Sequence, residues 1–148
     1  MIEVVPARQH HVGTIARRLR GIDVLECQAM GHTPKQALRI GLMGSTIAWT
    51  VLIDGRPEAM MGATPLNFTT GRGRPWLLMT DVAAKKAISL VRLGRLYTEA
   101  MHRQFAMLEN WIHADNETTI RYLARLGYAI GPVDVIRGFP MRPFVRLR

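Results

Sequence analysis

The chain has 148 residues, 48% of them hydrophobic, with 20 Lys and Arg against 11 Asp and Glu and a formal net charge of +9. This length is typical of one domain that buries a core of its own, so we expect a single domain over residues 1–148. No apolar run reaches the roughly 18 residues of a membrane span, and MIEVVPARQHH has no hydrophobic signal core. We therefore expect a cytoplasmic protein that binds no membrane.

The positive charge is mainly arginine, because the only lysines are Lys35, Lys85 and Lys86. The segment RGFPMRPFVRLR is rich in arginine, but the other arginines are not gathered into one block. Two interpretations remain open: a basic surface that keeps the protein soluble, or an anionic partner such as nucleic acid, a phosphate-rich cofactor or an acidic protein face. A nucleic-acid partner is possible but not favoured.

The cysteine and histidine positions predict no metal site. The single cysteine, Cys27, cannot form an internal disulfide and is expected to be buried and inert. His10, His11 and His32 show no metal-ligand spacing with a carboxylate or cysteine.

The first third of the chain predicts a strand followed by helices. IEVVP is typical of a short strand that ends at Pro6, which has no N–H to donate. Apolar residues then recur at helical spacing and predict an amphipathic helix over residues 9–20, broken by Gly21. DVLECQAMGH is a second short helical or irregular piece that stops at Gly31.

The next segments predict a third helix and then strands. TPKQ has the composition of a capping box and starts a helix that runs to about Gly44. STIAWTVLI and PEAMMGATPL are strand-like and flank the turn pair Asp54 and Gly55, which is typical of a hairpin. NFTTGRGR is predicted to be a loop, and RPWLLMT a short buried strand.

The last third predicts two helices between strands. After Asp81 an apolar stripe indicates a helix through roughly residue 105. MLENWIH is strand-like, and Asp115 or Asn116 caps the helix ETTIRYLARL, which ends at Gly127. YAIGPVDVI and FPMRPFVRL are predicted as two strands joined by a glycine-containing turn. Helices separated by runs of strands predict an α/β (α+β) domain around one sheet.

This order of elements, with NETTIRYLARLGY behind a strand, resembles the GNAT superfamily of acyl-CoA-dependent N-acyltransferases. The resemblance implies a central, mixed, mostly antiparallel sheet of about six to seven strands, flanked by about four helices. It also implies acetyl-CoA as the cofactor if the protein is active, and an amine of a protein or a small molecule as the acceptor.

A narrower resemblance comes from four segments in order: DVLECQAMGHTP, RPWLLMTD, the long basic helix and NETTIRYLARLGY. Together they resemble the internal virion protein A family of short-tailed phages. This resemblance implies a phage or prophage protein with a role in virion assembly and a phage or host protein as its partner. It places the protein in the infected or lysogenic bacterial cell, and in the virion as an alternative.

The sequence departs from the GNAT pattern where coenzyme A binds. The family opens its long helix with a loop of the type Arg/Gln-x-x-Gly-x-Gly/Ala, whose backbone N–H groups close on the pyrophosphate. The matching stretch here, DVAAKKAISL, has no glycine. Lys85, Lys86 and Ser89 offer charge and a hydroxyl instead, and Asn116 matches a position close to the cofactor. Gly94 is interpreted as a close-packing glycine rather than a displaced loop.

The sequence also departs from the pattern at the general acid. The family places a Tyr seven residues after the Asn, and that position is Leu123. Tyr122 lies one step earlier, rotated by about 100° around the helix, and is expected to face elsewhere. Losing a general acid typically costs about 10² to 10⁴ in rate. We therefore expect degraded catalysis, with an active acetyltransferase as the alternative.

Other acidic and basic residues are weaker candidates. Glu109 and His113 lie on one face of their strand and are candidates for a base acting through water, or surface residues. Asp81 is a candidate base or, more simply, a helix N-cap. Asp23 and Glu26 lie in the region that recognises the acceptor in the family, and they line a substrate or partner site or else a solvated turn.

Overall fold

A computed structural model describes the whole chain apart from the side chain of residue 87. The described chain forms one eight-stranded sheet and six helices, in the strand order β1-β2-β3-β4-β5-β8-β6, with β7 paired to β8. The strands are β1 Ile2–Pro6, β2 Ile47–Ile53, β3 Arg56–Asn67, β4 Arg72–Met79, β5 Met107–His113, β6 Ala129–Ile130, β7 Asp134–Ile136 and β8 Phe139–Leu147. The helices are α1 Gln9–Ala16, α2 Gly21–Ala29, α3 Pro34–Gly44, α4 Asp81–Ala84, α5 Ala87–His102 and α6 Glu117–Arg125.

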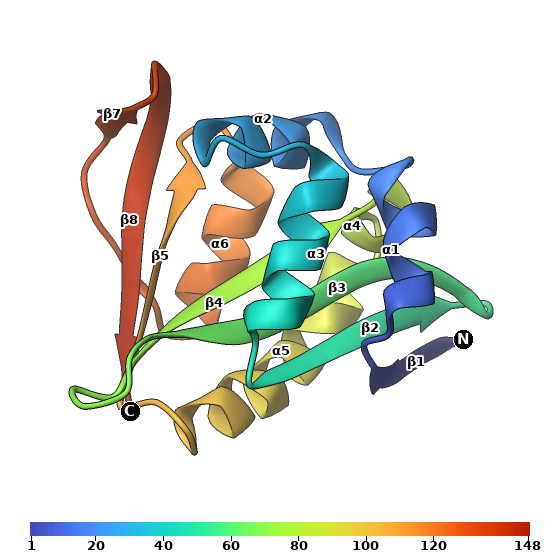
Figure 1. Ribbon diagram of the computed structural model, residues 1–148, viewed down its shortest axis with the longest axis horizontal. Helices are drawn as coiled ribbons and strands as arrows, with labels where there is room; N and C mark the ends of the chain where they lie inside the picture. Colours follow the sequence, from blue (N-terminus) through green and yellow to red (C-terminus); the bar gives the residue numbers. More distant parts are fainter.

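The helices cover both faces of the sheet (Figure 1). Successive residues of a strand point to opposite faces, so Met60 and Leu78 pack under α1 to α3 while Met61 and Met79 face the other side. A third group of buried side chains, around Phe105, packs under α5 and α6. All neighbouring strands pair antiparallel except β4 and β5, which confirms a mixed, mostly antiparallel sheet.

The predicted helix over residues 9–20 is too long. The helix α1 ends at Ala16, because Leu19 forms an antiparallel bridge with Thr80 and the Arg20 N–H donates to the Met79 carbonyl at 3.0 Å. Gly21 does separate two helices as expected, but it does so as the first residue of α2. The chain thus leaves the first helix to pair with the end of β4.

The predicted long helix after Asp81 is two helices. Thr80, not Asp81, is the N-cap of α4, and the chain turns at Lys85 and Lys86 before α5 begins. The capping-box start at Thr33 and the Asn116 cap are confirmed.

Two strand boundaries also differ from the prediction. The expected loop NFTTGRGR is a turn only over residues 68–71, because β3 runs to Asn67 and β4 starts at Arg72. The segment YAIGPVDVI is split into β6 and β7 at Gly131 and Pro132, where proline has no N–H for the ladder.

The structure bears on two expectations from composition, an inert Cys27 and the lack of a membrane span. Cys27 is a buried free thiol whose pKa is raised to about 12, mainly by burial, which fits an inert side chain. Over the described residues, no helix has the length and apolar character needed to cross a membrane.

Candidate functional site

Strands β4 and β5 start together and then separate, which leaves a wedge in the middle of the sheet. They pair only at Arg72–Met107 and Gly73–Leu108 and diverge beyond these two pairs (Figure 1). Helix α2 lies over the wide end of this wedge. Because the ladder is interrupted here, backbone groups on the facing edges of both strands are left to other partners.

The wedge contains a cavity of about 240 Å³. Its walls come from both faces of the sheet, since residues of α2 and α3 line one side and residues of α5 and α6 the other. At the narrow end, the Asn110 side-chain amide donates to the Pro75 carbonyl at 2.8 Å and ties β5 to β4. Most lining side chains are apolar or aromatic, among them Met30, Trp76, Tyr97, Trp111 and Leu123. Apolar walls with few polar groups are typical of a small-molecule site.

Asp23 of α2 occupies a backbone donor of β4. Its carboxylate accepts from the Met79 N–H at 2.9 Å and from two nitrogens of the Arg20 guanidinium, at 2.7 and 3.2 Å. Burial raises the pKa of Asp23, and the adjacent Arg20 opposes that shift. Residues two apart in a strand direct their N–H groups to the same edge, so the Leu77 N–H faces the wedge as well.

Glu26, one helical turn further along α2, accepts from the other side of the wedge. Its Oε1 accepts from the His113 N–H at 3.1 Å and from the Asn116 side-chain amide at 2.8 Å. Burial, followed by the negative charge of Asp23, raises the pKa of Glu26 from 4.5 to about 7. Glu26 also lines the cavity.

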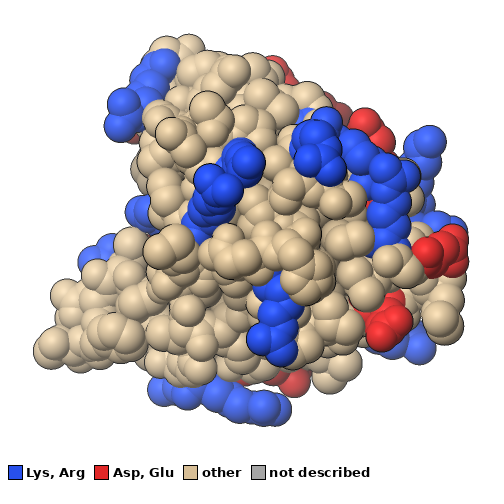
Figure 2. Space-filling model, turned by 45° about the vertical axis from the view of Figure 1, so that its right-hand side comes forward, with Lys and Arg blue, Asp and Glu red and all other residues tan. Residues whose placement is uncertain are grey.

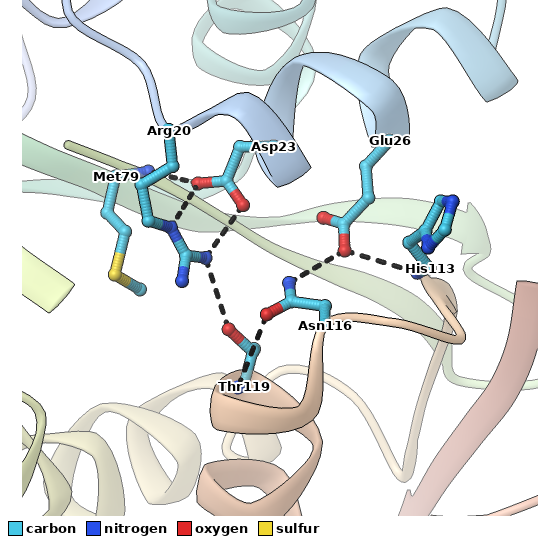
Figure 3. Close-up of polar contacts among 7 residues, drawn as sticks. All are labelled: Arg20, Asp23, Glu26, Met79, His113, Asn116 and Thr119. Carbon is cyan, nitrogen blue, oxygen red and sulfur yellow. Dashed lines mark hydrogen bonds and ion pairs between the residues drawn. The ribbon is translucent and has the colours of Figure 1, made fainter. Parts of the chain in front are cut away.

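Arg20, Asp23 and Glu26 together form what we call the α2 cluster. Figure 3 shows it reaching from Met79 at the end of β4 to His113 at the end of β5. Arg20 also donates to the Thr119 hydroxyl at 3.1 Å, which adds α6 to the network. The cluster therefore connects the two strands where their own ladder is absent.

The turn between α4 and α5 bonds the backbone donors of residues 83–86 internally. The Thr80 hydroxyl accepts from the Ala83 N–H, and the N–H groups of Ala84, Lys85 and Lys86 donate to carbonyls of residues 80–83. Lys85, Lys86 and Ser89 lie together at this junction and are exposed. They offer charge and a hydroxyl, but the N–H groups of residues 83–86 already have partners.

Tyr122 fills the contact between α5 and α6. Its hydroxyl donates to the Leu90 carbonyl at 3.3 Å, and burial raises its pKa to about 12. A side chain at Gly94 would collide with that hydroxyl, so Gly94 is a close-packing glycine, as predicted. Leu123, at the position of the family's tyrosine, is buried and faces the cavity.

The overall arrangement matches solved acetyltransferase structures. It superposes with a TM-score of 0.70 on the aminoglycoside acetyltransferase AAC(6')-Ib in complex with coenzyme A, at 11% identity over 100% of this chain and 95% of that one. The ribosomal-protein-S5-alanine acetyltransferase from Vibrio fischeri gives 0.67 at 12% identity over 99% and 92%, and a GNAT-family acetyltransferase from Streptococcus pneumoniae gives 0.63 at 8% over 99% of both chains.

The chain has the GNAT fold. No protein-family model matches the sequence, and no curated protein matches it either. At these identities the similarity establishes the GNAT fold alone.

Within the GNAT fold, the predicted base candidates do not come together. Glu109 pairs with Arg72 near the start of β5, while His113 is buried at the other end against Phe139. They are four residue steps apart along the strand, which corresponds to about 13 Å. The His113 Nδ1 accepts from the Asp115 N–H at 3.1 Å. Asp81 is exposed in the first turn of α4.

Asn116 is both the cap of α6 and a donor to Glu26. The sequence left open whether Asp23 and Glu26 form a site or a solvated turn, and the structure places both in the largely buried α2 cluster. The sequence signal for this cluster is its spacing. Arg20, Asp23 and Glu26 follow one another at intervals of three residues, which puts all three on one helix face.

His11 has structural partners. The His11 ring accepts from the Arg8 N–H and lies 2.8 Å from the Thr50 hydroxyl. Throughout the described part of the chain, no three Cys, His, Asp or Glu side chains are grouped as metal ligands.

Most basic side chains are dispersed on the face shown in Figure 2; a few adjoin one another at its upper right, where acidic groups lie nearby. This face therefore lacks the single continuous basic surface that is typical of nucleic-acid binding.

Proposed function

We propose that this chain is a GNAT-fold protein with degraded acyl-CoA machinery that works in the assembly of a phage particle. The proposal of degraded acyl-CoA machinery rests on the junction after β4. There the N–H groups of residues 83–86 are bonded within the α4 turn. A diphosphate bound there would compete with these hydrogen bonds, and exposed lysine ammoniums give charge without a shaped cradle.

Two further contacts support degraded catalysis. The Met79 N–H, on the wedge-facing edge of β4, donates to Asp23 and so has a partner other than a thioester. The hydroxyl of Tyr122 is bonded to the Leu90 carbonyl, and Leu123 has no proton to give a leaving thiolate. The absence of a general acid alone corresponds to about 10² to 10⁴ in rate.

The assembly role is supported by the resemblance of four segments, in order, to the internal virion protein A family. DVLECQAMGHTP carries much of that resemblance, and it contains Asp23 and Glu26, the two carboxylates of the α2 cluster. The proposed partner is a phage or host protein, in an infected or lysogenic bacterial cell or in the virion itself.

Calorimetric titration with acetyl-CoA tests the degraded machinery. We expect no binding tighter than roughly millimolar, which corresponds to about −4 kcal/mol. Acetyl-pantetheine is the matched control, because it lacks the nucleotide and diphosphate. Without a cradle the two donors should bind equally weakly, whereas micromolar affinity that depends on the nucleotide overturns the proposal.

A second candidate, an acetyl-CoA-dependent N-acetyltransferase, is favoured by the wedge itself. A cavity crosses the gap between β4 and β5, and Glu26, whose pKa is about 7, lines it. A group with this pKa suits a general base at neutral pH. Mass spectrometry after incubation with acetyl-CoA and amines separates the candidates, since the gain of one acetyl group by an acceptor supports the enzyme.

A further inference from the structure

One side of α5 packs into the protein, and the opposite side is exposed. The inner side enters the buried cores through Leu90, Leu93, Tyr97 and Met101. The outer side carries six exposed residues that lie within about 100° of one another around the helix axis. These residues, which we call the α5 stripe, are Ile88, Arg92, Arg95, Leu96, Glu99 and the C-cap Arg103. In Figure 1 α5 runs along the lower side of the molecule, and no other segment lies below it.

The α5 stripe exposes two large apolar side chains. Ile88 is 84% exposed and Leu96 is 59% exposed. They are eight residues apart, which corresponds to about 12 Å along the helix axis. Covering such side chains with apolar surface is favourable, and the phosphate backbone of a nucleic acid offers no such surface. The apolar part of the stripe therefore favours a protein partner over a nucleic acid.

The α5 stripe also carries positive charge that the fold does not neutralise. It contains three arginines, Arg92, Arg95 and Arg103, and one carboxylate, that of Glu99. Within the part of the chain that the structure describes, none of these four residues forms an ion pair. Two copies of the chain docked through this face would bring like charges together, so the charge favours an acidic partner over a homodimer.

The dimensions of the α5 stripe fit a single helix. From Ile88 to Arg103 it is about 22 Å long, and one helix is about 10 Å wide. This area is far below the roughly 800 Å² per partner of a stable interface, so a weak and reversible contact is expected. Arginines lie between the two apolar residues along the helix, so the stripe has no continuous apolar face that could enter a lipid bilayer.

We propose that the α5 stripe is a docking surface for an acidic amphipathic helix of a partner protein. The apolar side chains of that helix cover Ile88 and Leu96, and its carboxylates pair with the three arginines. Arginine suits this role because its planar guanidinium can bind a carboxylate with two hydrogen bonds. The stripe faces away from the wedge, so docking requires no acyl-CoA and holds for either candidate function.

Fluorescence anisotropy of a labelled peptide of about 18 residues tests the proposal on the full chain. The peptide carries leucines and glutamates on one helix face, and a scrambled peptide has the same composition without that face. We expect the amphipathic peptide to bind at least about tenfold more tightly than the scrambled one. Its affinity should fall about fivefold between about 50 mM and 300 mM salt, because the ion pairs are exposed. Labelled duplex DNA and phosphatidylglycerol vesicles should bind more weakly than this peptide.

The charge of the stripe is tested by Arg92→Gln combined with Arg95→Gln. The matched control is Arg17→Gln combined with Arg39→Gln, which removes two exposed charges beside α1 and on α3 and leaves the same net charge. The first pair should weaken binding of the amphipathic peptide about fivefold, and the control pair less than about twofold. Equal losses in both pairs would mean that the peptide responds only to the net charge, which overturns the proposal.

The apolar part is tested by Ile88→Gln, with Met43→Gln as the matched control, because Met43 is 77% exposed on α3. Ile88→Gln should weaken peptide binding about fivefold, and Met43→Gln less than about twofold. The proposal is wrong if Ile88→Gln binds like the original chain, or if the scrambled peptide binds as tightly as the amphipathic one. Tighter binding of the DNA or the vesicles, or no saturable peptide binding up to about 1 mM, contradicts it as well.

Discussion

The wedge and the α4–α5 junction follow one another along the chain at the end of β4, and they satisfy their backbone N–H groups in different ways. At the junction the donors of residues 83–86 bond to oxygens within the same short segment. In the wedge the donors of Met79 and His113 reach carboxylates of α2, which lie far away in sequence. A local turn can form from its own residues, whereas the wedge depends on α2.

This difference predicts where the fold is most sensitive. Replacing Asp23 by Ala would leave the Arg20 guanidinium without its carboxylate and Met79 without an acceptor, both in buried surroundings. We expect a loss of about 3 to 5 kcal/mol in the free energy of unfolding, measured by denaturant titration. Glu117→Ala is the control and should change stability by less than about 0.5 kcal/mol. A small effect of Asp23→Ala would mean that α2 does not hold the wedge.

Glu26 gives the wedge a pH dependence. Because the folded-state pKa of Glu26 is raised from 4.5 to about 7, the folded chain binds more protons than the unfolded chain between these values. The contribution of Glu26 to stability is fully present below about pH 4.5 and is lost as pH rises through about 7, by up to about 3 kcal/mol.

The comparison of the original chain with Glu26→Gln isolates this effect from other titrating groups. The difference in unfolding free energy between the two proteins should shift in favour of the glutamine variant between pH 5 and pH 8. A difference that stays constant over this range would show that Glu26 keeps an ordinary pKa.

A smaller effect is expected where α5 contacts α6. A methyl group at Gly94 would collide with the Tyr122 hydroxyl, so Gly94→Ala should cost about 1 to 3 kcal/mol despite the better helix propensity of alanine. Adding Tyr122→Phe removes the colliding hydroxyl, and the double variant should recover part of the loss. If the double variant recovers no stability, the cost of Gly94→Ala comes from a contact other than the Tyr122 hydroxyl.

The smallest effect is expected at the junction. Lys85 and Lys86 are exposed, so replacing both by Ala should change stability by less than about 0.5 kcal/mol. If the acyl-CoA machinery is degraded as proposed, the same variant should bind acetyl-CoA within about threefold of the original chain, because no tight contact with the diphosphate is expected there. A tenfold loss of acetyl-CoA affinity would show that these lysines hold the phosphates after all.

The order of elements could be predicted from local patterns. The period of the apolar residues, the capping box at Thr33, the Asn116 cap and the hairpin turn at Asp54 each act over a few residues, so the sequence predicts them well. The errors lie where tertiary contacts override local preference. One example is Leu19, whose bridge to Thr80 draws it out of the predicted helix.

The candidate site was only partly predictable. Missing glycines and a missing tyrosine are visible in the sequence, and Gly94 was correctly interpreted from its place in the apolar stripe. The importance of Glu26 was not predictable, because its raised pKa depends on burial by residues far away and on the charge of Asp23.

The sequence by itself determined most of the helices and strands and which residues of the GNAT pattern are absent, because both depend on the identity and spacing of nearby residues. Only the tertiary structure decided that β4 and β5 separate around a cavity, and that Arg20, Asp23 and Glu26 bridge the gap. Strand separation and carboxylate burial arise from contacts between segments far apart in sequence, such as that of Glu26 with Asn116, 90 residues away. Local sequence patterns carry no information about such contacts.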